Sequence, residues 1–167
     1  MDSMSERELA VSLYNRCWEL LEAGARTPDD DVELLTSAFT SRFHWRRVGT
    51  PQQWVVSDWM VARAAGTVGY YSLAMAFALR ANRAAQAGGL PDWLVASCAE
   101  GVARAYAVSG DRDRVKEWAN RAATLVAAIA GDEDRALIAA QLASIEVGPR
   151  PFAGEGVLST RGARRIV

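Results

Sequence analysis

Histidine, cysteine and lysine are scarce in this sequence. Its 167 residues include one histidine, His44, and two cysteines, Cys17 and Cys98, which lie far apart in the chain. Structural zinc and iron–sulfur sites need several such ligands at short spacing, so we expect no metal site and no bound cofactor. The two thiols are typical of a buried core, and a disulfide between them is the alternative.

An excess of charge of one sign and a long apolar run are also missing. The net charge is -1, which argues against nucleic-acid binding because that activity needs a basic surface. No stretch is long and apolar enough to cross a membrane. Glu6 and Glu8 precede any apolar run, unlike the start of a signal peptide, so we expect a cytoplasmic protein that does not bind membranes.

Motifs of catalysis are missing as well. A nucleophilic serine needs a base within reach, and the sole imidazole, His44, has only Ser37, Thr40 and Ser41 on neighbouring turns. No nucleophile elbow, phosphate-binding loop or dinucleotide glycine fingerprint is present. We therefore predict that the chain is not an enzyme.

Apolar residues make up half of the chain, enough for the core of one domain. They recur at helical spacing and nowhere alternate as in a half-buried strand, so we predict an all-α fold. Capping residues, glycines and prolines divide the chain into about seven helices. These are expected from Ser5 to Gly24, Pro28 to Gly49, Pro51 to about Val68, Tyr70 to Ala87, Pro91 to Ser109, and after Asp111 and Asp132.

Two further features concern the second helix and the end of the chain. Leu35, Phe39 and Phe43 form the stripe that we expect the second helix to bury. Residues 148–167 are rich in glycine, proline and arginine, which favours a flexible tail. We therefore expect one helical-repeat domain over residues 1–147, followed by this tail.

The sequence contains an internal repeat. A shift of 41 positions superposes Val61–Ala64 on Val102–Ala105 and Gly69 on Gly110. The expected helix boundaries coincide after the same shift. Two successive pairs of helices are therefore predicted to be equivalent.

The second unit resembles a tetratricopeptide repeat. Ala103 lies where that family prefers glycine, Tyr106 matches its tyrosine, Ala122 matches its later alanine, and Gly110-Asp111 forms the turn. The resemblance covers residues 54–130, in units longer than those of the family. It implies antiparallel helical hairpins stacked as a short right-handed solenoid.

A longer set of residues resembles a group of small bacterial helical-repeat proteins. It includes His44-Trp45, Val48–Pro51, Trp59, Arg63 and the Ala103–Tyr106 segment. This resemblance implies the same fold and no particular activity.

Six residues are candidates for binding a ligand or peptide. His44 and Trp45 end the second helix, whereas Trp59 and Arg63 share a face of the third. In the structural alternative the tryptophans are buried and Arg63 pairs with Asp58 or Glu100. The full set of candidates is His44, Trp45, Trp59, Arg63, Tyr70 and Arg104.

Two functions follow from these candidates. The first is a protein- or peptide-binding module, with Trp59, Arg63 and Arg104 on an open groove and a homodimer as a version of the same idea. The second is a small-molecule sensor, or less favoured an enzyme, with a pocket near His44, Trp45, Trp59 and Arg63. An open row of arginines would favour the first, and an enclosed cavity the second.

Overall fold

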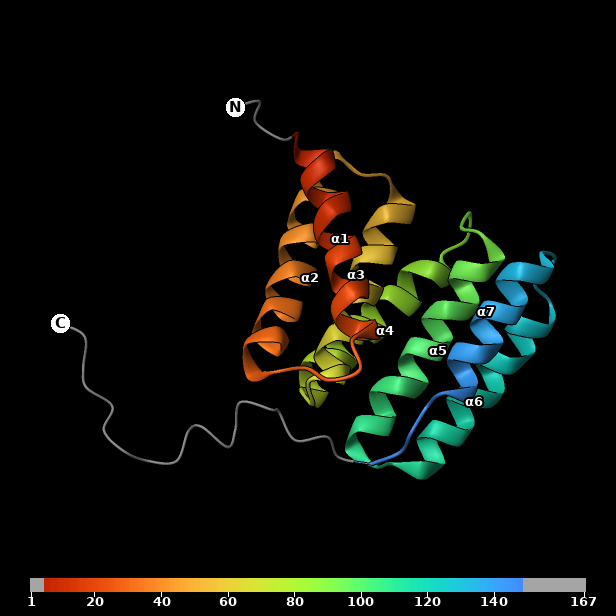
Figure 1. Ribbon diagram of the computed structural model, residues 1–167. Helices are drawn as coiled ribbons and strands as arrows, with labels where there is room; N and C mark the ends of the chain where they lie inside the picture. Colours follow the sequence, from red (N-terminus) through yellow and green to blue (C-terminus); the bar gives the residue numbers. More distant parts are fainter. Residues whose placement is uncertain (1–4, 149–167) are drawn as a thin grey trace, which may run out of the picture.

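The computed structural model describes residues 5–148, and this part of the chain forms seven helices and no strand. Successive helices pack as antiparallel hairpins, which confirms the predicted all-α class (Figure 1). The expected tail lies outside the described residues from position 149 onwards. The helices are α1 (Glu6–Glu22), α2 (Pro28–Val48), α3 (Pro51–Thr67), α4 (Tyr71–Gln86), α5 (Asp92–Ser109), α6 (Arg112–Ala127) and α7 (Asp132–Ala143).

The predicted capping residues set the starts of the first three helices. Ser5 and Glu8 form a capping box, in which the Ser5 backbone N–H donates to Glu8 Oε2 at 2.7 Å. Thr27 precedes a proline at the start of α2. At the start of α3 the backbone N–H of Thr50 donates to Gln53 Oε1 at 2.8 Å. Each box satisfies donors that a helix start leaves unpaired, so the boundaries agree closely with the sequence.

The repeat is visible in the helix boundaries. Both α3 and α5 begin at positions 41 apart, and α4 and α6 begin and end 41 apart. Gly69 and Gly110 occupy equivalent turns with φ of 91° and 78°, a region that favours glycine. Ala62 and Ala103 are both buried. The two hairpins therefore share one backbone plan.

The odd-numbered helices line one face of the molecule. Each pairs with the helix that follows it, and α1, α3, α5 and α7 also contact one another in succession. Among the described helices, α2 and α4 have no Cα atoms within 8 Å of each other. In Figure 1 the last helix, α7, lies against the hairpin of α5 and α6. One face is thus built from α1, α3, α5 and α7.

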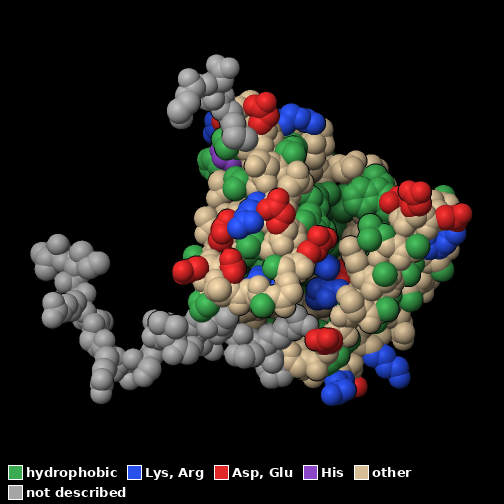
Figure 2. All heavy atoms as spheres, in the orientation of Figure 1, with side chains coloured by type: hydrophobic (Ala, Val, Ile, Leu, Met, Phe, Trp, Pro, Cys, Tyr) green, Lys and Arg blue, Asp and Glu red, His purple; other side chains and the backbone are tan. Residues whose placement is uncertain are grey.

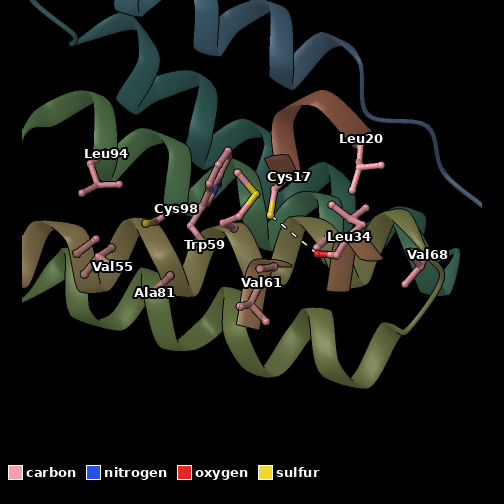
Figure 3. Close-up of a cluster of buried hydrophobic side chains, with 14 residues drawn as sticks. Cys17, Leu20, Leu34, Val55, Trp59, Val61, Val68, Ala81, Leu94 and Cys98 are labelled. Carbon is pink, nitrogen blue, oxygen red and sulfur yellow. Dashed lines mark hydrogen bonds between the residues drawn. The ribbon is translucent and has the colours of Figure 1, made fainter. Parts of the chain in front are cut away.

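Both cysteines belong to the main core (Figure 3). Cys17 Sγ lies 3.9 Å from the Leu34 carbonyl oxygen, to which its thiol donates, and Cys98 is equally buried. Both thiols are free, which removes the disulfide alternative. Burial disfavours the thiolate and raises the pKa of each to about 12. They act as small apolar residues.

The expected core stripe of α2 is wrong. Phe39 and Phe43 are 37% and 58% exposed. The buried face instead carries small residues that let α1 approach closely, as shown by Ser41 Oγ donating to the Ala10 carbonyl at 2.7 Å. Large rings do not fit at that distance. They lie at the edge of α2, where Phe39 contacts Phe77 edge-to-face.

Two helical glycines are expected to respond oppositely to alanine. A Cβ on Gly66 would meet only Val108 and Ala74, at ordinary contact distances of 3.5 and 3.7 Å. A Cβ on Gly101 would lie 3.1 Å from Trp59 Cδ1. Gly66→Ala should therefore raise the free energy of unfolding by about 0.5–1 kcal/mol through helix propensity.

Gly101→Ala should lower the free energy of unfolding by about 1–3 kcal/mol, because the close contact outweighs the same propensity gain. Urea denaturation of both variants measures the difference. A stabilised Gly101→Ala variant would contradict the close packing of α5 on Trp59.

Candidate functional site

A recess lies on the face built from α1, α3, α5 and α7. In Figure 2 hydrophobic side chains gather in the hollow between the α1 side and the α7 side, with basic side chains below them. The apolar part is lined by side chains of all four helices. They include Tyr14, Val56, Trp59, Trp93, Leu137 and Gln141.

The recess continues into a cationic hollow of about 300 Å³. Arg26, Arg63 and Arg104 contribute its positive charge, while Leu21 and Thr67 form part of its wall. The remaining lining comes from the segment after α7, at Ser144 and Glu146. Apolar and cationic surfaces thus adjoin on one face.

Glu100 holds two of these arginines in place. Its side chain is fully buried on α5, and its Oε1 lies 2.5 Å from Arg104 Nη2 and 3.8 Å from Arg63 Nη1. Arg104 Nη2 also donates to the Gln141 carbonyl at 2.6 Å. A single carboxylate therefore fixes guanidinium groups from α3 and α5, and Arg104 connects them to α7.

Arg63 is enclosed by aromatic rings. Its Cζ lies 5.2 Å from the ring centroid of Trp18 and 5.4 Å from that of Trp59. Burial lowers the pKa of Arg63, and the nearby positive charge of Arg104 lowers it further. Its buried Nη1 has no hydrogen-bond partner among the described residues. An anion in the hollow would supply both the missing acceptor and a compensating charge.

The structure brings together three of the six predicted site residues. Trp59 and Arg63 lie on the recess with Arg104, and their positions match the predicted groove rather than an enclosed cavity. The structural alternative also describes them correctly, because Trp59 is buried and Arg63 approaches Glu100. Buried contacts and a solvent-facing edge coexist in the same residues.

The other three candidates lie elsewhere. His44 Nδ1 is 3.8 Å from Glu6 Oε2, between α1 and α2. The Trp45 carbonyl accepts a 3.0 Å hydrogen bond from Trp54 Nε1 at the start of α3. Among the described residues no pocket contains either of these candidates together with Arg63. Tyr70 borders a separate hollow at the start of α4. The expected cluster of His44 and Trp45 with Arg63 does not form.

Sequence reasoning missed the contribution of α1 and α7 to the recess. Tyr14, Trp18 and Leu21 recur at spacings of four and three, a second apolar stripe that faces the recess instead of the core. That spacing was the available signal. No comparable pattern marks Gln141 or Ser144, because their roles depend on where α7 packs.

No family model, curated protein or solved structure matches this chain. None of the described helices is long and apolar enough to span a membrane. Within residues 5–148 no three His, Cys, Asp or Glu side chains form a group that would hold a metal ion.

Proposed function

We propose that this chain is a non-enzymatic binding module that holds a polypeptide segment in the recess of α1, α3, α5 and α7. The observation that carries the proposal is the pairing of Arg63 and Arg104 on Glu100 beside an apolar surface. Such a site fits an extended or helical segment with an acidic side chain next to an apolar one.

The electrostatics support this class of ligand. Arg63 lacks a hydrogen-bond acceptor for its buried Nη1, and Arg26 adds a further positive charge to the hollow. Arg104 is already fixed by several contacts, so it loses little side-chain entropy when a ligand binds. Exposed Leu137 borders the apolar part, where it would contact an apolar side chain of the ligand.

A repeat architecture supports the same proposal. Stacked hairpins present side chains from successive helices along a continuous surface, which is how helical-repeat proteins bind extended partners. The resemblance to tetratricopeptide repeats agrees with this use, although no comparison tests it. A second copy of the chain is the polypeptide partner in the homodimer version.

A small-molecule sensor is the second candidate. The cationic hollow of about 300 Å³ favours it, because that volume lies at the lower end of ligand pockets. Its ligand would be a small anion bound by Arg26, Arg63 and Arg104. This site differs from the expected one, since it does not include His44 or Trp45.

Native mass spectrometry of protein purified from its own host separates the candidates. We expect a retained polypeptide, or a homodimer, that Leu137→Glu releases because it places a charge in the apolar part. Val11→Glu is the matched control, since Val11 is also exposed but lines none of the pockets of the described residues. A retained small mass would favour the sensor. A bare monomer, or binding that survives Leu137→Glu, would contradict the recess as a polypeptide site.

A further inference from the structure

A second groove, larger than the recess, lies where α2 ends, α3 begins and α4 ends. Its volume is about 1090 Å³. Side chains alone bridge α2 and α4 here, since no Cα atoms of these described helices come within 8 Å of each other. The groove shares no lining residue with the recess described above.

Arginines dominate the charge of this groove. Asp58 is buried in its floor, with Oδ1 2.5 Å from Arg42 Nε and Oδ2 2.7 Å from Arg80 Nε. Arg46 and Arg83 are exposed on its rim, and neither has an ion pair among the described residues. Four arginines therefore surround one carboxylate, and the local charge is strongly positive although the whole chain is at -1.

Aromatic and aliphatic side chains line the same groove. Arg46 stacks over Trp54 at 4.9 Å and Arg42 over Phe77 at 5.2 Å, which holds both guanidinium groups against apolar walls. Phe39 and Phe43 extend this apolar surface along α2, on the stripe that the sequence assigned to the core. Their exposure is explained if a partner covers them.

We propose that this groove binds an acidic amphipathic helix of a partner protein. The apolar face of that helix would pack on Phe39, Phe43 and Leu79, and its carboxylates would pair with Arg46 and Arg83. Charge complementarity selects an acidic occupant. A bilayer is flat and does not fill a recess of this depth, and a nucleic acid needs a cationic surface without apolar walls. The proposal does not depend on the function of the first recess.

Fluorescence anisotropy with a designed peptide tests this inference. The probe is a labelled helix of about 18 residues, with leucines at spacings of three and four on one face and glutamates elsewhere. We expect it to bind the full chain, and Arg46→Glu combined with Arg83→Glu to weaken binding by about tenfold or more. Both arginines are exposed, so circular dichroism should show an unchanged fold.

Two controls isolate the groove. Arg112→Glu with Lys116→Glu makes the same change in charge on exposed positions of α6 and should leave binding unchanged. A twin peptide with lysines in place of glutamates should not bind. The inference is overturned if the acidic peptide does not bind, if the α6 variant weakens it equally, or if vesicles of phosphatidylcholine and phosphatidylserine bind at the groove in its place.

Discussion

Glu100→Ala is expected to lower the free energy of unfolding by about 3–5 kcal/mol, measured by urea denaturation. The Glu100 side chain is fully buried, and it is the carboxylate that both Arg63 and Arg104 approach. Alanine would leave two guanidinium groups close together and largely buried without a counter-charge. Removing one partner of a buried ion pair is costly because the remaining charge has lost its water and gains nothing in return.

Glu117 provides the matched control. It also holds two arginines, with Oε2 2.9 Å from Arg114 Nη1 and Oε1 2.8 Å from Arg121 Nη2, but all three side chains are exposed. Glu117→Ala should cost no more than about 1 kcal/mol, since water and salt screen such pairs. Equal losses in the two variants would show that water reaches Glu100, and would contradict the buried arrangement.

The backbone plan was predictable because its signals are local. A capping box such as Ser5 with Glu8 acts within a single turn, and Gly110 marks a turn through its own backbone conformation. The spacing of 41 residues then repeated these signals in two hairpins. Helix boundaries follow from residues a few positions apart, so a single sequence carries them.

Packing between helices was harder to predict, as α2 shows. Periodicity identifies stripes but does not say which stripe is inside, and the large side chains of Phe39 and Phe43 suggested the wrong one. The inner stripe includes Ala38 and Ser41, which the close approach of α1 requires. That distance is set by two helices together, and neither sequence segment contains it alone.

The candidate site was predictable where the repeat constrained it. Arg63 and Arg104 are 41 residues apart, on equivalent helices of a single face, so the shift that aligned them also predicted their proximity. His44 and Trp45 were grouped with them from chain order alone. The turn between α2 and α3 does bring Trp45 to Trp54, but Arg63 lies more than two turns further along α3.

Trp59→Ala is expected to lower the free energy of unfolding by about 3–5 kcal/mol. Trp59 is 6% exposed, donates from Nε1 to the Ser97 carbonyl at 3.0 Å, and stacks on one side of Arg63. Alanine would leave a cavity at the junction of α3 and α5 and would free the guanidinium group. Trp118 is only partly buried on α6, so Trp118→Ala should cost about 1–2 kcal/mol.

A double-mutant cycle with Gly101 tests the cause of that loss. In the native chain Gly101→Ala is unfavourable because its Cβ would lie 3.1 Å from the Trp59 ring. In the Trp59→Ala background that obstacle is gone, so Gly101→Ala should become stabilising by about 0.5–1 kcal/mol. Denaturation of the four proteins gives the coupling directly. If Gly101→Ala has the same effect in both backgrounds, the ring does not pack on α5, and the floor of the recess is built differently.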